Sequence, residues 1–232
     1  MPYYKSLARK EFEKNIFLFI KICRSSNSEK IGLSDHAINA IFHAAIFKAS
    51  ALLEEYLKNI IIDWLFLAQK NSCLSHELPE NLRWFLFSNS QIEIFKNFLY
   101  DKDEKKLIDE IKKRRIDIEI IQDDNNIHFN PKIVVEDRKY PSIKNMKALF
   151  NRIGMQDVFE TINRKNRKDF KFLIQSFLDI RVAIAHQSPP DLTYQDIKMH
   201  LTHLIEFVKV LDRIFFSHIL SHNGPSCWRT SQ

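Results

Sequence analysis

Arg181 and His186 are the residues of this chain whose types and spacing could do chemistry. They lie at the end of an apolar segment, residues 173–186, and are separated by four residues. Arginine is always charged and can hold a phosphodiester as it gains negative charge, while histidine can move protons near neutral pH. The pair is therefore sufficient for cleavage of RNA without a metal ion, with the ribose 2′-hydroxyl as internal nucleophile.

A helix over residues 168–187 is predicted to position this pair. Its core face is predicted from apolar residues that recur every three or four positions: Phe170, Leu173, Phe177, Ile180 and Ile184. Arg181 lies on the margin of that face, in the row Ile174, Leu178, Arg181, Ala185. Pro189 and Pro190 end the helix soon afterwards. We therefore expect His186 in the last turn, where the helix dipole favours its protonated form.

The segment from Arg181 to His186 resembles the Arg-x4–6-His signature of the HEPN superfamily. These are small all-helical proteins that carry the motif in their penultimate main helix. A second likeness is the stretch from Ser142 to Gly154, similar to the helix ending in glycine that precedes the motif helix. The resemblance covers about residues 35–220 and is closest to families from bacterial toxin–antitoxin and defence loci. Nuclease members usually carry a polar residue after the arginine, where this chain has Val182.

The resemblance implies a metal-independent endoribonuclease, a toxin or defence effector, with RNA as substrate. His186 would act as general base or acid, and Arg181 would stabilise the charged phosphorane. It also implies a homodimer in which two such pairs face each other, with a cognate antitoxin or defence-system protein as a further partner. On an ideal helix five residues correspond to about 140°, so a second copy could complete the site. The alternative, suggested by Val182, is a catalytically inactive HEPN-like interaction or RNA-binding module.

Composition favours an all-α fold in a cytoplasmic setting. Apolar residues make up 45% of the chain, with 19 phenylalanines and only 3 glycines, which suits long helices. The cysteines Cys23, Cys73 and Cys227 are scattered, so neither a zinc site nor a disulfide framework is expected, and no cofactor is predicted. The N-terminus lacks a signal peptide. The most apolar segment, 60–68, is too short to span a bilayer, so no membrane association is expected.

The periodicity predicts a single HEPN-like helical bundle over residues 1–220, with an insertion at about 115–141. The expected helices are 4–24, 35–70, 80–87, 90–114, 142–153, 156–163, 168–187 and 194–220, with the second, seventh and eighth forming the core. Ser34 and Thr193 are expected N-caps, and Gly154 an expected C-cap. Residues 127–135 carry a strand or hairpin signal inside the insertion. Residues 221–232 are expected to form a flexible tail.

Two basic runs are candidate contacts for an anionic partner of this chain of net charge +6. The first ends the helix 90–114. The second leads into the motif helix and contributes the candidate substrate-binding residues Arg164, Lys165, Arg167 and Lys168. The alternative for the first run is a solvated helix end that complements the helix dipole.

Acidic residues could support Arg181. Glu54 and Glu55 could orient it through a charge-assisted bond, and Asp179 is a further candidate. The alternative for Glu54 and Glu55 is a solvated pair that balances Lys48 and Lys58.

The last helix carries three potential metal ligands on one face: His200, His203 and Glu206. They lack the HExxH arrangement, and no second ligand helix is evident. We therefore predict no metal.

Overall fold

The computed structural model describes residues 2–113, 126–138, 140–186 and 191–230. These residues form α-helices and short 3₁₀ turns without a strand, which confirms the all-α prediction. The helices are α1 (Leu7–Ser26), α2 (Asp35–Lys70), α3 (Glu80–Asp101), α4 (Glu104–Lys113), α6 (Ile143–Arg152), α7 (Val158–Asn166), α8 (Phe170–Ala185) and α9 (Tyr194–His222). The 3₁₀ turns are η1 (Glu29–Ile31), η2 (Ser75–Glu77), η3 (Pro131–Val134) and η4 (Pro225–Cys227).

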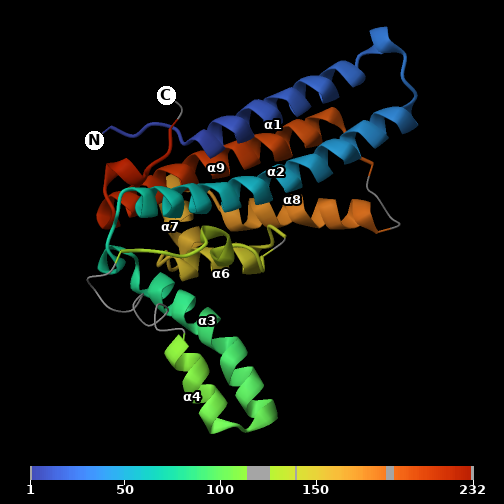
Figure 1. The fold of residues 1–232 in the computed structure, drawn as a ribbon. Coiled ribbons are helices and arrows are strands. Elements are labelled where there is room, and N and C mark those ends of the chain that lie inside the picture. The colour runs from blue at the N-terminus through green and yellow to red at the C-terminus, as the bar shows by residue number, and fades with distance from the viewer. Residues whose placement is uncertain (1, 114–125, 139, 187–190, 231–232) are drawn as a thin grey trace.

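Four long helices lie alongside one another and form the body of the molecule (Figure 1). The longest, α2, contacts α1, α8 and α9, and α8 runs antiparallel to α9. The shorter α6 and α7 pack against α8, and α3 continues into α4 as an arm that projects from the body. The predicted core of three long helices is confirmed, with α1 as an additional member.

By length and composition alone, α2 could also cross a membrane. Its side chains Phe42, Ile46, Leu53 and Trp64 are buried against neighbouring helices instead. Core helices commonly pass the same test, so the signal is weak.

Helix ends follow the capping signals of the sequence. The Ser34 hydroxyl accepts the backbone N–H of Ala37 at 3.3 Å, and Thr193 and Asp196 form a reciprocal capping box at the start of α9. Gly154 follows α6 with φ +82°, a conformation that glycine adopts without strain. A Cβ there would lie 2.7 Å from that of Pro79, so glycine also permits α6 to approach the start of α3.

The prediction of two helices at 80–87 and 90–114 is wrong. A single helix, α3, runs to Asp101, because the polar residues 88–90 include neither proline nor glycine and do not interrupt it. The break comes at Lys102, which has φ 53°, and α4 begins at Glu104.

The predicted β insertion is also wrong in the described residues. Asn130 accepts the N–H of Lys132 through its side chain, and Pro131 begins η3 where a strand was expected. Val134 and Val135 are buried, and η3 contacts α2. Hydrophobic residues that suit a strand thus pack on a helix, because the described residues offer no partner strand. Residues 115–125 and 139 of the predicted insertion lie outside the described part of the chain.

The C-terminal segment is packed up to residue 230, contrary to the predicted flexible tail. Cys227 is fully buried and Trp228 nearly so. The indole N–H of Trp228 donates to the carbonyl of Tyr4 at 2.8 Å, and the N–H of Leu7 donates to the carbonyl of Arg229 at 3.0 Å. Burial of the Trp228 side chain thus orders this segment, although its glycine and proline predicted a frayed end. Residues 231–232 lie outside the described part.

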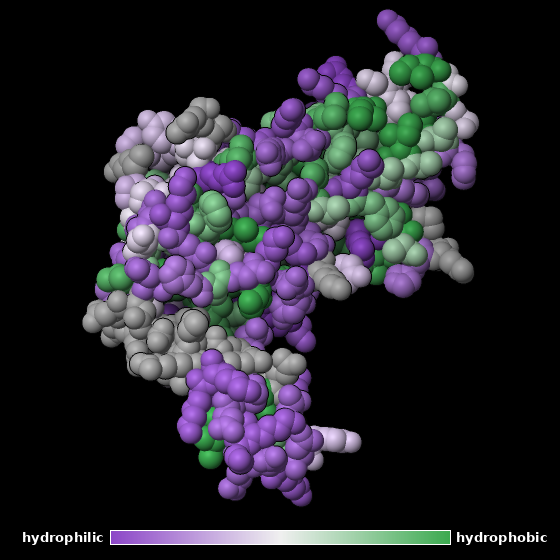
Figure 2. All heavy atoms as spheres, in the orientation of Figure 1, coloured by the Kyte–Doolittle hydropathy of each residue, from purple (hydrophilic) through white to green (hydrophobic). Residues whose placement is uncertain are grey.

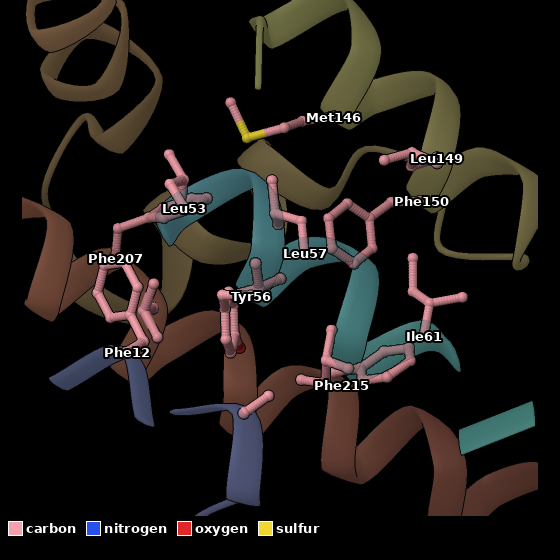
Figure 3. Close-up of a cluster of buried hydrophobic side chains, with 14 of the residues drawn as sticks. Phe12, Leu53, Tyr56, Leu57, Ile61, Met146, Leu149, Phe150, Phe207 and Phe215 are labelled. Atoms are coloured by element: carbon pink, nitrogen blue, oxygen red, sulfur yellow. The ribbon is translucent and has the colours of Figure 1, made fainter. Parts of the chain in front are cut away.

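The core is formed by apolar side chains that converge from several helices (Figure 3). The cluster in the figure includes Phe12 from α1, Leu53, Tyr56, Leu57 and Ile61 from α2, Met146, Leu149 and Phe150 from α6, and Phe207 and Phe215 from α9. Burial of each such side chain stabilises the fold by roughly 1.5–3 kcal/mol. Core packing therefore fixes the position of α2 and α9, against which α8 rests.

The buried face of α8 differs from the predicted one. Phe170 and Phe177 are buried as expected, but the remaining buried positions are Ile174 and Leu178. Leu173, Ile180 and Ile184 are only partly buried. Because Ile174 and Leu178 belong to the row of Arg181, the helix turns Arg181 further toward the body than the sequence pattern suggested.

A buried carboxylate joins the N-terminal segment to α2 and α9. Asp212 has no exposed surface and accepts hydrogen bonds from the hydroxyls of Tyr3 (2.5 Å), Ser6 and Tyr56 (3.3 Å). The backbone N–H of Ser6 donates a further bond at 3.2 Å. Burial raises the pKa of Asp212 despite these donors. The carboxylate is thus tolerated in the core only because the N-terminal segment and α2 both supply donors to it.

Replacing Asp212 with alanine should destabilise the fold by about 3 kcal/mol or more. The change leaves several buried hydroxyls without an acceptor, and each such loss costs about 1–3 kcal/mol. Urea unfolding measures the change. Asp179→Ala is the matched control at an exposed carboxylate and should stay within about 0.5 kcal/mol of wild type. An Asp212→Ala protein as stable as that control would contradict the role assigned to the network.

His218 should make the protein less stable in acid. Burial, together with His222, lowers its pKa to about 4, from 6.5, and its Nε2–H donates to the carbonyl of Ile153 at 2.8 Å. The unfolded state therefore binds more protons between about pH 4 and 6.5, so stability falls as the pH falls through this window. The expected loss is on the order of 3 kcal/mol at pH 4.

The measurement is urea unfolding at pH 7 and pH 4.5, for wild type and His218→Asn. The variant should lose less stability on acidification, even if it is weaker at pH 7. The pKa of buried His200 is lowered as well, and this residue is present in both proteins, so the difference isolates His218. Equal losses in the two proteins would refute the prediction.

Candidate active site

Two aromatic rings flank the side chain of Arg181. Its guanidinium carbon lies 5.7 Å from the ring centre of Phe47, on α2, and 5.6 Å from that of Tyr140, in the segment before α6. Arg181 makes no hydrogen bond or ion pair with the described residues. The ring faces attract the cation without occupying its N–H donors. The geometry therefore holds Arg181 in place and leaves its donors available to an oxyanion.

His186 marks the end of α8. The last helical residue is Ala185, and His186 follows with an extended backbone (φ −97°, ψ 153°) whose N–H donates to the carbonyl of Val182 at 3.1 Å. The expected place in the last turn is thus wrong by one residue, because the chain leaves the helix before the two prolines. The imidazole is exposed. Residues 187–190, which follow it, lie outside the described part.

The surface beside the motif is apolar as well as basic. Val182 is 45% exposed, Phe47 37% and Tyr140 61%. Figure 2 shows hydrophobic residues at the end of the molecule where α1 joins α2. Ile22, near the end of α1, and Ile31, in η1, are exposed. In Figure 1 the C-terminal end of α8 lies at the same end of the bundle. This end could therefore accept an apolar partner surface.

The predicted acidic support for Arg181 is not seen. Glu54 pairs with Lys58 on its own helix at 2.5 Å, which is the alternative weighed for it. Glu55 is exposed and lines a hollow between α1 and α2. Asp179 accepts a hydrogen bond from the amide of Gln175 at 2.7 Å. Glu54 and Asp179 thus bond to residues of their own helices, and Glu55 forms no ion pair with Arg181 among the described residues, so none of the three orients Arg181.

The second basic run lies at the opposite end of α8. Arg164 and Arg167 are exposed, and Lys165 and Lys168 line a groove beside α9. A helix of 16 residues is about 24 Å long, so α8 separates this run from His186. The fold therefore places the four predicted substrate-binding residues together but does not bring them to Arg181.

The three potential metal ligands on α9 do not converge. His200 is buried, which lowers its pKa, and its Nδ1 has no partner among the described residues. Glu206 pairs instead with Lys168 at 2.7 Å. In the described part of the chain no three histidine, cysteine or acidic side chains form a metal-binding group.

Phe47 and Tyr140 are the site residues that the sequence did not reveal. Phe47 lies outside the apolar row that predicts the core face of α2, and an aromatic residue outside such a row is the only signal that the sequence offers. That row is Ile38, Phe42, Ala45, Ala49, Leu52 and Tyr56. Tyr140 precedes Pro141 in the stretch interpreted as an insertion. Their meeting with Arg181 joins three segments far apart in the sequence, which no local pattern indicates.

Comparison of this chain with known proteins identifies its family. No curated protein and no solved structure matches it. The family model described as RiboL-PSP-HEPN matches residues 8–216, which include α1, α2 and the motif helix and most of α9. Because that match covers most of the chain, the family is established, and the expectation of HEPN superfamily membership is confirmed. The chain belongs to the RiboL-PSP-HEPN family.

Proposed function

We propose that this protein is a metal-independent endoribonuclease that uses Arg181 and His186. The observation that carries the proposal is the environment of Arg181. Its guanidinium is held between two aromatic rings and bonded to no carboxylate among the described residues. A structural arginine would donate its hydrogen bonds to protein groups, whereas the N–H groups of Arg181 remain available to a ligand. Membership of a HEPN family supports the same assignment.

The proposed reaction is transesterification within RNA. The ribose 2′-oxygen attacks the adjacent phosphorus, the bond to the 5′-oxygen breaks, and the product carries a 2′,3′-cyclic phosphate. His186 takes the proton from the 2′-hydroxyl or gives one to the leaving oxygen. Arg181 donates hydrogen bonds to the phosphorane oxygens as their charge increases. DNA lacks the 2′-hydroxyl and cannot follow this route.

A second copy of the chain is proposed to complete the site. One histidine cannot easily serve as base and acid in a single concerted step, whereas two can share the transfers. The exposed apolar side chains beside the motif, Val182 and Phe47, supply a surface that a partner copy could cover. The proposed assembly is thus a two-fold dimer with both motifs at one cleft.

In the cell, we propose that the protein acts in the cytoplasm as a toxin or defence effector. An RNA-cleaving enzyme of this kind must be restrained, so an antitoxin or defence-system protein is its proposed partner. Expression in bacteria should therefore arrest growth, and His186→Ala should relieve the arrest. A neighbouring gene for a small antitoxin would support this role.

The alternative is an interaction or RNA-binding module without catalysis. Val182 favours it, because an apolar, 45% exposed side chain stands where active relatives carry a polar one. In that case Arg181 would bind a phosphate or a partner, and His186 would only end the helix. The two functions differ in whether bound RNA is cut.

Purified protein should cut single-stranded or tRNA-like RNA in the presence of EDTA and leave DNA of the same sequence intact. His186→Ala and Arg181→Ala should each reduce the rate at least about a hundredfold, because proton transfer and charge stabilisation typically contribute that much each. Single-turnover cleavage of a labelled RNA measures both effects. Lys14→Ala, at an exposed lysine in the middle of α1, is the control and should retain the wild-type rate.

Two results would count against the catalytic assignment. A wild-type protein inert on every RNA tested, with alanine variants indistinguishable from it, would support the binding module. Activity that survives in His186→Ala would instead move the chemistry elsewhere in the chain.

If two chains share one site, an inactive chain should abolish the activity of the wild-type chain with which it pairs. Light scattering should give twice the chain mass of 27.6 kDa. When a ninefold excess of His186→Ala is exchanged into wild type, activity per wild-type chain should fall about tenfold, because most wild-type chains then have an inactive partner. The same mixture assayed before exchange should keep full activity. A fully active monomer, or activity unaffected by exchange, would rule out the composite site.

A further inference from the structure

A groove lined mainly by charged side chains lies between α9 and the junction of α7 with α8. We propose that it is a second anion site, which holds the phosphate backbone of single-stranded RNA far from Arg181. We name it the α9 groove. Its volume is about 480 Å³, and its charged and polar lining is Lys165, Asn166, Lys168, Glu206, Lys209, Arg213 and Ser217. The identity of its ligand as RNA rests on the proposed function.

The balance of charge in the α9 groove is positive. Four cationic side chains face one carboxylate, Glu206, which already pairs with Lys168. Lys209 and Arg213 form no ion pair with the described residues. Arg213 lies 5.4 Å from the ring centre of Tyr3, which orients the guanidinium without neutralising it. The groove therefore retains cations that an anionic ligand can bind.

The arrangement of these groups favours a chain of phosphates over a single one. Lys209, Arg213 and Ser217 follow at intervals of four residues on α9, so successive side chains lie about 6 Å apart along one face. Lys165 and Lys168 form the opposite wall. A site for one phosphate would converge its donors on a point, whereas these donors follow a line. A linear polyanion matches that line.

The floor of the groove argues against an acidic peptide. Its apolar lining is Phe170 and Ile214, which are 1% and 6% exposed, and Val210, which is partly buried. A peptide would find almost no apolar pocket for its side chains, and such pockets carry most of the affinity of protein partners. Phosphate contacts need only cations and hydrogen-bond donors at the surface. The charged and polar side chains of the walls supply these cations and donors.

The experiment measures binding of a fluorescent 20-nucleotide RNA whose 2′-hydroxyls are methylated, so that it cannot be cleaved by the proposed route. The test variant is Lys209→Gln/Arg213→Gln. It should bind at least about tenfold more weakly at low salt, and each lost contact should reduce the slope of log affinity against log salt by about 0.7. Lys14→Gln/Arg24→Gln changes the net charge equally at exposed positions on α1 and should bind like wild type.

Competition identifies the ligand. Inorganic phosphate at matched ionic strength should fail to displace the RNA, while unlabelled RNA should displace it. Equal affinity and slope for the groove variant and wild type would overturn the proposal. So would polyglutamate that binds as tightly as RNA and loses as much in the variant, since the groove would then suit a protein partner.

Binding and cleavage fail separately. His186→Ala should bind the methylated RNA as wild type does, because the α9 groove lies at the other end of α8. Groove-dependent binding by a protein that never cuts RNA would defeat the proposed function and leave this inference standing. If the protein cleaves RNA and its groove variant binds RNA as tightly as wild type, the proposed function stands and this inference is wrong.

Discussion

The buried carboxylate of Asp212 is the constraint around which this bundle is assembled. A charge removed from water is tolerated only where donors surround it. Here they come from Tyr3 and Ser6 in the N-terminal segment and from Tyr56 on α2. The network is extended by Arg9, which donates to the Tyr3 hydroxyl at 2.7 Å. Because these donors must all reach one carboxylate, α1, α2 and α9 have one mutual arrangement, and the cluster of Figure 3 packs around it.

Helix α8 takes its place from that arrangement. It packs against both α2 and α9, and the rotation that buries Ile174 and Leu178 also directs Arg181 toward Phe47 and Tyr140. Aromatic rings restrain a guanidinium weakly, by roughly 0.5–1 kcal/mol at exposed sites. A carboxylate would restrain it more firmly and would also compete with a phosphate. The fold thus restrains Arg181 less firmly than a carboxylate would, but leaves its N–H donors available to a phosphate.

The two basic regions of the surface are separated by the length of one helix. Arg181 and His186 lie at the C-terminal end of α8, and the α9 groove begins at its N-terminal end with Lys168. In the proposed function these ends have different tasks, chemistry at one and retention of the backbone at the other. An enzyme that acts on a polymer can use such a division, since cleavage and binding then depend on different side chains.

Local patterns in the sequence determined most of the helices of this protein and several of their ends. Ser34, Thr193 and Gly154 cap helices because their short-range chemistry acts within a few residues, and the motif ending at His186 indicated the superfamily. The tertiary structure alone decided contacts between distant segments. Residues 127–135 form no strand in the described chain because Val134 and Val135 pack on α2, and Trp228 holds a tail that glycine and proline seemed to loosen. Likewise the ion pair of Glu54 with Lys58 and the contacts of Arg181 with two aromatic rings depend on the fold. Side-chain partners of this kind follow from packing and not from spacing along the chain.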